Sequence, residues 1–413
     1  MRSSLRDMTL ICVAAWLRSF GIGFLGVVLG VFLYRQGFSS TAIGLVVAAG
    51  LAGAAAATAL VTFKADRVGR RKTLFLLSLL TAVGVVPLIR HSGLALLVPV
   101  AFLGMLNGMG TDRSASFALE QAIIPGLFSD QRRTWSLAWY NLVLDSSGAF
   151  GALAAGLPLL AQRWWGLDLN TSYRAMFLGY VAASIFSGML YLCLTEQVEV
   201  RDRQALRKEA IVVSAATKST VRKLAALFSI DSLGGGLLTD ALVSYWFFRR
   251  FGVAENKLAV LFFAVHVLNA LSHLGAAALA KRIGLVKTMV FTHLPSSIFL
   301  IAASFAPSAK WAVVMFLLRE SLVEMDVPTR QSYVAAVVRP DERTFASGVT
   351  NLTRNISWAA SASVAGLFMQ KIAMSFPLLL GGSLKILYDL LLWRAFRHVA
   401  PPEERAASLR PVG

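Results

Sequence analysis

The sequence predicts an all-α polytopic membrane protein with twelve transmembrane helices in two pseudo-symmetric six-helix bundles. Three observations lead to this prediction. Of the 413 residues, 56% are hydrophobic and only 15% are charged, whereas about 25% of the residues in a soluble domain are charged. Apolar runs of about 20 residues, the length that crosses the hydrocarbon core of a bilayer, recur along the chain. The two halves of the sequence also resemble each other, which predicts a duplicated bundle.

The apolar runs place six spans in each half of the chain. They lie at 8–34, 41–63, 74–92, 95–125, 135–161, 175–195, 224–248, 256–280, 288–306, 310–338, 345–370 and 375–397. We therefore expect an N-terminal bundle at 1–195, a cytoplasmic linker at 196–223, a C-terminal bundle at 224–397 and a cytoplasmic tail at 398–413. An even number of spans puts both termini on one side of the membrane, and the excess of Lys and Arg in the segments on that side predicts that it is the cytoplasm.

A short basic stretch at 64–73 separates the second span from the third. A run of charges cannot lie in hydrocarbon, so this stretch predicts a tight loop at the cytoplasmic surface. A degenerate copy lies at 281–288, in the second half of the chain. At a constant offset of 210 residues, the two halves also match at the pairs Gln121 and Gln331, Thr134 and Thr344, Asn141 and Asn351, Asp145 and Asn355, and Gly156 and Gly366. Several matches at one offset support the duplication.

The net charge of +18 comes from 40 Lys and Arg against 22 Asp and Glu. Most of the basic residues fall in predicted terminal and cytoplasmic segments, as membrane orientation requires. They form no continuous basic face with stacking aromatics, so we expect no nucleic-acid partner. The two cysteines, Cys12 and Cys193, offer neither a disulfide scaffold nor a thiolate metal cluster. The sequence has no P-loop, no Ser/His/Asp set and no H-E-x-x-H motif, so we expect neither a cofactor nor an enzymatic activity.

The basic loop, the 6 + 6 repeat and the long central linker together resemble the major facilitator superfamily, over essentially the whole chain. The loop signature of that family is roughly G-x-x-x-D-R-x-G-R-R/K. Thr62 stands where its first glycine is expected, and the copy at 281–288 keeps Gly284. The stretch 325–333 is similar to one that bacterial members often carry in the tenth helix. The remaining signature positions are filled by Asp66, Arg67, Gly69, Arg70 and Arg71.

Two departures bear on the subgroup within that family. Drug-exporting members usually carry an arginine ahead of a G-x-G in the fourth helix, where this chain has Gly104. Their fifth helix usually has a G-P-x-x-G-G signature, which the fifth span lacks. The resemblance therefore implies a bacterial twelve-helix type, with a drug-efflux-like subgroup as an option that these residues do not indicate.

The resemblance also implies that the first, fourth, seventh and tenth helices line a central aqueous cavity. Most charged residues inside the predicted spans fall on these four helices, and a charge inside the membrane is costly unless it is paired or faces water. We expect a substrate cavity lined by Arg18, Asp112, Arg113, Asp240 and Arg319. We expect proton coupling by Asp112, Glu320 and Asp145. We expect a cytoplasmic gate and signature loop made of Asp66, Arg67, Gly69, Arg70, Arg71, Glu120, Glu324, Asp326 and Arg330.

The alternative is that these charges form internal salt bridges that fix helix packing. Arg18 and Asp112 are one candidate pair, and Asp66 is expected to cap a helix or to pair with an arginine of its own loop. Lys385 and Asp389, four residues apart, predict a local ion pair on the twelfth span.

The histidines of the spans do not follow a metal-ligating pattern. His266 and His273 lie two turns apart on the eighth span with no acidic residue between them, which predicts polar packing. His293 is a lone histidine on the ninth span and is interpreted in the same way. We expect no metal site.

We expect a secondary active transporter that moves a small molecule across the cytoplasmic (inner) membrane by alternating access. Carboxylates inside the membrane favour coupling to protons, although facilitated diffusion stays open. The resemblance implies efflux by antiport, because bacterial members of this length often export. An organic-anion carrier is the first alternative, because Arg18, Arg113 and Arg319 supply positive charge. A lipid or metal-ion carrier and a non-transporting membrane receptor or scaffold also stay open. The expected partners are the substrate, the proton gradient and the lipid bilayer, and we expect a monomer.

Overall fold

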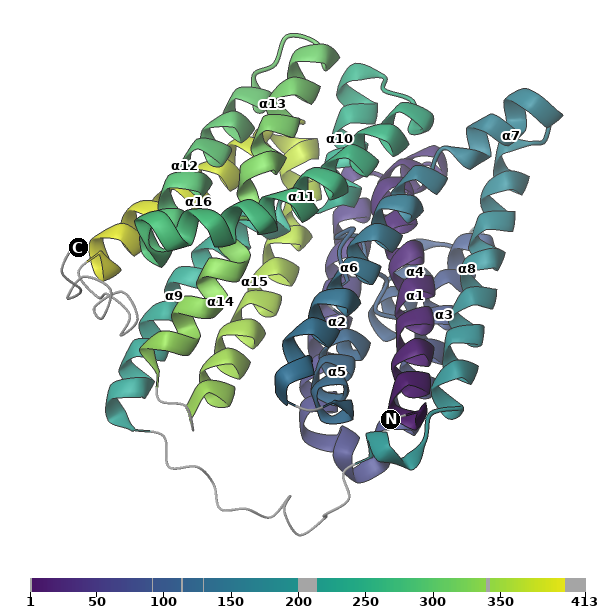
Figure 1. Ribbon diagram of the computed structural model, residues 1–413. Coiled ribbons are helices and arrows are strands. Elements are labelled where there is room, and N and C mark those ends of the chain that lie inside the picture. Colours follow the sequence, from purple (N-terminus) through teal and green to yellow (C-terminus); the bar gives the residue numbers. More distant parts are fainter. Residues whose placement is uncertain are drawn as a thin grey trace. The chain divides into compact units, whose positions relative to one another are not determined.

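The computed structural model describes residues 2–90, 92–112, 114–128, 130–199, 214–338 and 342–397, and these residues form helices and connecting turns without a strand (Figure 1). Nine of the described helical segments are long and apolar enough to cross a membrane. The predicted all-α membrane fold is therefore confirmed. The predicted tail at 398–413 and residues 200–213 of the predicted linker lie outside the described residues.

The chain divides into two compact units. Unit 1 comprises Met1–Lys208, Thr239–His266 and Ala362–Met374. Unit 2 comprises Glu209–Leu238, Val267–Ser361 and Ser375–Gly413. The domain boundaries predicted from the sequence stay a prediction.

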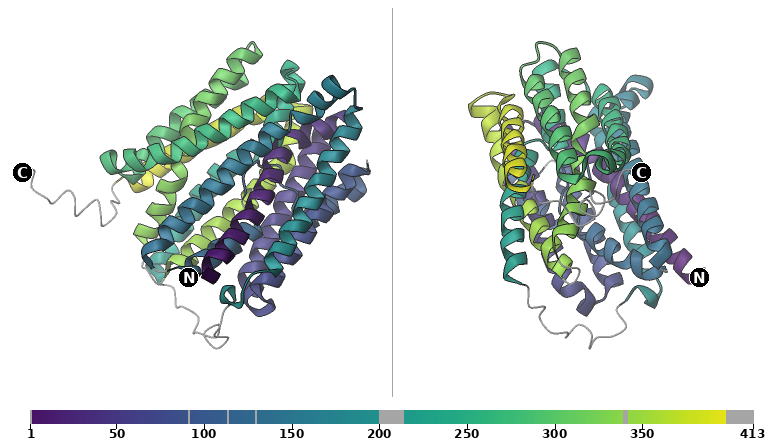
Figure 2. Two further views of the ribbon diagram at one scale, coloured as in Figure 1. Left: turned by 45° about the vertical axis from the view of Figure 1, so that its right-hand side comes forward. Right: turned by 60° about the vertical axis from the view of Figure 1, so that its left-hand side comes forward.

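Five helices of unit 1 have 20 residues or more, and the purple and blue helices run alongside one another in both views of Figure 2. Helix α1 packs against α6, α8 and α10, and α3 packs against α4 and α8. The elements of this unit are α1 (Arg2–Arg35), α2 (Ser40–Val68), α3 (Arg70–Ile89), α4 (Leu94–Leu103), α5 (Ala115–Ile123), η1 (Ile124–Leu127), α6 (Asp130–Ala154), α7 (Leu157–Trp165), α8 (Leu169–Leu192), η2 (Glu196–Val198) and α10 (Asp240–Phe251).

In unit 2, helix α12 packs against α13, α14 and α16, and α16 also packs against α9. Two further helices, α11 (Glu255–Ile283) and α15 (Arg343–Lys371), contribute residues to both units. The other helices of unit 2 are α9 (Ala215–Gly236), α12 (Leu285–Ser304), α13 (Ala309–Val323), α14 (Asp326–Val337) and α16 (Phe376–Phe396).

Four predicted spans contain a break between two helices that the sequence analysis did not predict, although Trp139–Trp165 and Thr217–Phe251 each remain long and apolar enough to cross a membrane. The expected spans at 95–125, 135–161, 224–248 and 310–338 each consist of two helices, namely α4 and α5, α6 and α7, α9 and α10, and α13 and α14. Polar caps inside the apolar runs explain two of these breaks. The hydroxyl of Ser114 accepts from the Phe117 N–H at 3.2 Å to start α5, and that of Thr239 accepts from the Leu242 N–H at 3.4 Å to start α10.

The glycine at the end of α4 is required by close packing. A Cβ at Gly104 would lie 2.2 Å from the Cα of Gly84 in α3, which is far inside van der Waals contact. The position that carries an arginine in drug-exporting relatives therefore accepts no side chain here unless the backbone moves.

Helix α9 begins at Ala215, inside the stretch predicted as a linker, and the Ser214 hydroxyl accepts from the Thr217 N–H at 3.2 Å. Glu342 accepts from the Ser214 N–H at 2.6 Å, so the cap itself is held by a residue distant in the sequence.

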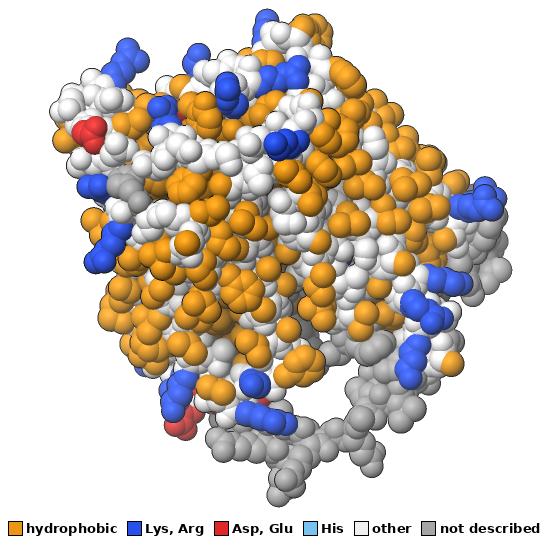
Figure 3. Space-filling view, turned by 180° about the vertical axis from the view of Figure 1, so that it is seen from behind, with side chains coloured by type: hydrophobic (Ala, Val, Ile, Leu, Met, Phe, Trp, Pro, Cys, Tyr) orange, Lys and Arg blue, Asp and Glu red, His pale blue; other side chains and the backbone are white. Residues whose placement is uncertain are grey.

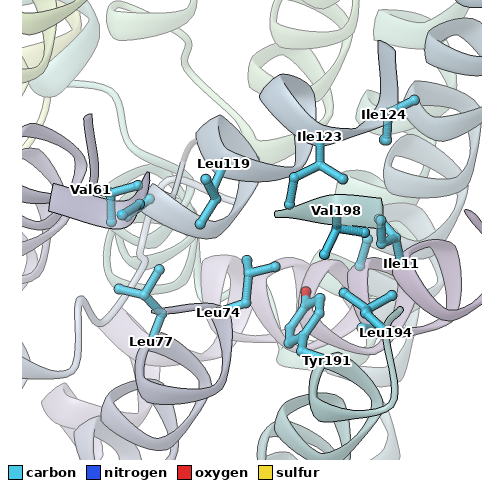
Figure 4. Close-up of a cluster of buried hydrophobic side chains, with 14 of the residues drawn as sticks. Ile11, Val61, Leu74, Leu77, Leu119, Ile123, Ile124, Tyr191, Leu194 and Val198 are labelled. Carbon is cyan, nitrogen blue, oxygen red and sulfur yellow. The ribbon is translucent and has the colours of Figure 1, made fainter. Parts of the chain in front are cut away.

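A cluster of buried hydrophobic side chains joins several elements of unit 1 (Figure 4). It brings together Ile11 of α1, Leu74 of α3, Leu119 of α5 and Val198 of η2, which are at most 5% exposed. Each such side chain contributes about 1.5–3 kcal/mol when it is buried from water. The cluster also contains Tyr140 and Tyr191, so it packs directly against the polar groups described below.

The surface is unusually apolar for a folded chain. Phe63, Trp165 and Phe305 are 76%, 72% and 68% exposed. Figure 3 shows hydrophobic side chains over much of one face, with Lys and Arg side chains gathered toward its edges. Because apolar patches of this extent are unfavourable in water, they indicate contact with lipid.

Candidate functional site

A buried ion cluster forms in unit 1 around Arg18 of α1. Its Nε donates to Asp112 Oδ2 at 2.8 Å, and its Nη2 donates to Glu120 Oε2 at 2.5 Å. The side chains of Arg18, Asp112 and Glu120 are only 8%, 1% and 0% exposed. The predicted pairing of Arg18 with Asp112 is therefore confirmed, and Glu120 completes what we call the Arg18 cluster.

Two tyrosines close this cluster, and the sequence analysis missed both. Tyr140 of α6 donates to Glu120 Oε2 at 2.6 Å, and Tyr191 of α8 donates to Glu120 Oε1 at 2.5 Å. Tyr191 also accepts from Arg18 Nη1 at 2.6 Å. No local pattern distinguishes these two tyrosines from the other aromatic residues of the apolar runs, so the sequence alone held no signal for them.

The Arg18 cluster is not balanced in charge. One guanidinium faces two carboxylates, so the cluster carries one excess negative charge unless a proton is bound. Glu120 accepts from Arg18 and from both tyrosines. Among the hydrogen bonds that the described residues form, Asp112 accepts one from Arg18 and one, at 3.1 Å, from the Ser114 N–H. Asp112 therefore has fewer hydrogen-bond donors than Glu120.

Asp240 lies against the break between α4 and α5. Gly110, in that break, has φ +80°, and a Cβ there would lie 1.8 Å from Asp240 Oδ2. Glycine is needed at this position both for the backbone conformation and for the approach of Asp240. His266 Nε2 lies 3.8 Å from Asp240 Oδ2. Among the described residues no group of three His, Cys, Asp or Glu side chains has the arrangement of a metal site.

The other predicted cavity and coupling residues have varied surroundings. Arg319 forms an ion pair with its neighbour Glu320 on α13, and its guanidinium lies 5.6 Å from the ring centre of Phe316. Glu320 is 3% exposed. Asp145 is half-buried on α6. Arg113 lies outside the described residues.

The signature loop joins α2 to α3 through Gly69. Arg70 Nε donates to Asp66 Oδ1 at 2.7 Å, so the predicted pairing of Asp66 with an arginine of its loop is confirmed. Glu199, which the sequence analysis did not single out, accepts from the backbone N–H groups of Arg70 and Arg71 at 2.7 and 3.2 Å. It therefore caps the start of α3, where a carboxylate is favoured by the helix dipole. Arg67 is exposed.

The same end of unit 1 holds the start of α1. Asp7 accepts from the N–H and the hydroxyl of Thr195 at 3.0 and 2.5 Å. The N-terminal helix, the signature loop and the residues that follow α8 thus meet at one end of the unit. This agrees with an even number of crossings between the N-terminus and the central linker.

A second buried polar cluster forms in unit 2, and it corrects one prediction. Lys385 does not pair with Asp389 as expected but donates to Asp231 Oδ1 of α9 at 2.7 Å. Asp389 instead faces Nδ1 of His293 at 3.0 Å. His293 therefore contacts a buried carboxylate of another helix, which its isolated position in the sequence did not indicate. These partners come from α9, α12 and α16, so spacing within one helix could not reveal them.

The residues assigned to the cytoplasmic gate have partners within their own unit. Arg330 Nη1 donates to Asp326 Oδ2 at 2.6 Å and to Asp231 Oδ2 at 3.1 Å, all in unit 2. Glu324, at the end of α13, is half-buried. Glu120 lies in the Arg18 cluster of unit 1. Their role in a gate stays a prediction.

Comparison with known proteins agrees with this architecture. A membrane protein of Saccharomyces cerevisiae, itself described as uncharacterized, is 25% identical over 94% of this chain and 93% of its own length. The solved structure of a variant of the nucleoside transporter NupG is 13% identical, with a TM-score of 0.72 over 95% of this chain and 100% of that chain. That of a D-xylose–proton symporter is 15% identical, with a TM-score of 0.71 over 95% of this chain and 97% of that chain.

The two structures share the fold with this chain, and the predicted resemblance is confirmed by a match that covers most of the sequence. Residues 11–362 match the Major Facilitator Superfamily, and the chain belongs to this family of membrane transporters.

Proposed function

We propose that the protein is a proton-coupled secondary transporter that exports a small molecule by alternating access. The observation that carries this proposal is the excess negative charge of the Arg18 cluster. The cluster sets two buried carboxylates against one guanidinium, so one bound proton would balance its charge, and Asp112 is the carboxyl group with fewer hydrogen-bond donors. A site that binds a proton inside the membrane is the part that coupling to a proton gradient requires.

The second support is the distribution of charge along the chain. Basic residues are concentrated in the termini and in the loops at 64–73 and 281–288, which favours a cytoplasmic position for these segments. We infer that the protein lies in the cytoplasmic membrane with both termini in the cytoplasm, and that it works as a monomer. Glu320 and Asp145 stay candidates for a coupling role, and Asp240 and Arg319 for contact with substrate.

The alternative of an organic-anion carrier loses part of its support. Arg18 faces two carboxylates and Arg319 pairs with Glu320, so neither guanidinium offers an uncompensated positive charge to an anion. An uncharged or cationic small molecule is therefore the better first choice for the substrate.

The experiment begins with a thermal-shift screen of the purified protein against pentoses, nucleosides, amphipathic cations and organic anions. A compound that binds the folded state raises its stability with the logarithm of ligand concentration. The best stabiliser is then offered to proteoliposomes with and without an acidic interior. Exchange of one proton for one neutral molecule gives about tenfold accumulation per pH unit, because one pH unit is about 1.4 kcal/mol.

Matched variants test the coupling assignment. Asp112→Asn is expected to keep binding in the thermal-shift assay and to lose accumulation driven by the pH gradient. Asp168→Asn makes the same chemical change at an exposed helix cap of α8, where asparagine caps as well as aspartate, and should transport as the wild type. If Asp112→Asn and Glu320→Gln both retain full accumulation, the coupling assignment is wrong. Accumulation that needs an acidic exterior would refute export, and absence of flux for every stabilising compound would refute transport.

A further inference from the structure

The polar cluster of unit 2 is centred on His293, and the proposed function does not use it. Nδ1 of His293 lies 3.0 and 3.1 Å from the two carboxylate oxygens of Asp389. Nε2 lies 3.4 Å from Nζ of Lys385 and 3.7 Å from Oδ1 of Asp231. The side chains of His293 and Asp389 are only 2% and 0% exposed. The imidazole is therefore held between two carboxylates and an ammonium group, away from solvent.

This geometry provides partners for both protonation states of the imidazole. In the neutral state, Nδ1–H donates to Asp389 and the lone pair of Nε2 accepts from the Lys385 ammonium group. In the protonated state, Nε2–H faces Asp231, while Lys385 keeps its 2.7 Å hydrogen bond to the same carboxylate. A change between the two states needs only a small movement of the Lys385 side chain.

The charge of the cluster favours binding of one proton. With a neutral imidazole, three carboxylates (Asp231, Asp326 and Asp389) face two cations (Arg330 and Lys385), which leaves one excess negative charge. The next charged groups do not change this balance. Arg354 of α15 lies close enough to attract Asp231, and Glu324 close enough to attract Arg330.

The neighbouring helix α13 adds no net charge to the cluster, because its Arg319 pairs with Glu320. A buried excess charge is strongly unfavourable, and one proton on the imidazole removes it.

Two buried polar atoms of the cluster have no hydrogen-bond partner among the described residues. They are the hydroxyl of Tyr388 and Oδ1 of Asp326. The two residues are 0% and 2% exposed, and the Tyr388 ring lies edge-on to His293 with 5.8 Å between the ring centres. The Tyr388 hydroxyl is an unused donor on a residue packed against the imidazole, and Asp326 Oδ1 is an unused acceptor on a carboxylate that pairs with Arg330. Such groups are what a bound water molecule or hydronium ion would satisfy.

We propose that this cluster, made of residues 231, 293, 326, 330, 385 and 389, is a proton-binding site whose proton is carried by Nε2 of His293. A hydronium ion transfers its proton to the lone pair of Nε2 and leaves as water, and release to water is the reverse step. Because the cluster is closed to solvent here, exchange needs another conformation. Binding of a proton by this cluster does not depend on the proposed function. The further consequence, that this proton crosses the membrane during transport, rests on the proposed function.

The test measures the protonation of His293 in the full-length protein in detergent micelles, without substrate or gradient. Histidine is labelled with ¹⁵N, and the signals of His293 are assigned by their loss in His293→Gln. In the wild type, His293 should change from protonated to neutral between about pH 5 and pH 9. Asp389→Asn balances the cluster with a neutral imidazole, so His293 should stay neutral throughout. Lys385→Met adds to the excess negative charge and should move the midpoint upward by about 1–3 pH units.

Lys287→Met is the matched control for the lysine, because Lys287 is exposed on the same helix as His293 and should leave the midpoint unchanged. The proposal is overturned if wild-type His293 keeps one protonation state over this range, a result that does not depend on the Asp389 and Lys385 variants. It is also overturned if Asp389→Asn and Lys385→Met move the titration in the same direction. Flux that is independent of pH would refute proton-coupled export and leave this equilibrium result untouched, so the two failures can be told apart.

Discussion

Replacing Arg18 by methionine tests whether the Arg18 cluster holds unit 1 together. The change removes the guanidinium that both Asp112 and Glu120 contact, and it leaves most of the volume of the side chain filled. Because the three side chains are between 0% and 8% exposed, water cannot replace the lost partner. Removal of one partner from a buried ion pair costs about 3–5 kcal/mol. With two carboxylates affected, we expect a loss near the upper end, about 4–5 kcal/mol in the free energy of unfolding.

A double-mutant cycle isolates the ionic part of this loss. Glu120→Gln alone should cost about 1–3 kcal/mol, since Arg18 and Asp112 stay paired while the hydrogen bonds to the former carboxylate weaken. In the double variant only Asp112, and not Glu120, is a carboxylate left without its guanidinium partner. The double variant should therefore be more stable than the sum of the single effects predicts, by at least about 1.5 kcal/mol.

The assay is equilibrium unfolding in mixed detergent micelles, followed by the fluorescence of the nine tryptophans. Arg6→Met is the matched control, because Arg6 is an exposed residue of the same helix and a surface change is worth no more than about 0.5 kcal/mol. The reasoning is refuted if Arg18→Met costs no more than Arg6→Met. It is equally refuted if the two single effects add without coupling.

Three further outcomes are expected. Gly110→Ala should destabilise unit 1 by about 1–3 kcal/mol in the same unfolding assay, because φ is +80° at this position and the new Cβ would meet Asp240. The control is Gly179→Ala, on a helix with open space around the glycine, which should be neutral or stabilising. Glu199→Gln should lower stability by about 0.5–1 kcal/mol and increase hydrogen exchange of the two arginine N–H groups that it caps. Val68 is 56% exposed in the signature loop. In a background without the two native cysteines, Val68→Cys should react with a membrane-impermeant thiol reagent only from the cytoplasmic side. Labelling from outside would show that the orientation is the reverse of the one proposed.

The predicted helices agree with the structure where the apolar run is uninterrupted by a cap. Helices α1, α2, α3, α8, α12 and α16 each fall on one predicted span. The runs at 95–125 and 224–248 are equally apolar, yet Ser114 and Thr239 start new helices inside them. A single Ser or Thr in a long apolar run is common in membrane helices and often hydrogen-bonds to its own helix, so its role as a cap is decided by packing.

The candidate site was predictable only in part. Charge inside a predicted span marked Arg18, Asp112 and Glu120, because a buried charge requires a partner wherever it lies. That rule does not say which partner. Tyr140 and Tyr191 lie in α6 and α8 and meet Glu120 only after these two helices have packed on α1. His293 carried no local signal at all, since its partners Asp231 and Asp389 lie 62 and 96 residues away along the chain.

The amino-acid sequence by itself determined that this chain enters a membrane, that it does so as helices and that its halves are related. Those properties follow from the hydropathy of about 20 consecutive residues and from repeated positions, which are local and can be counted along the chain. The partner of each buried charge was decided only by the tertiary structure. An ion pair depends on distances of about 3 Å between helices distant in sequence, and no one-dimensional pattern contains those distances.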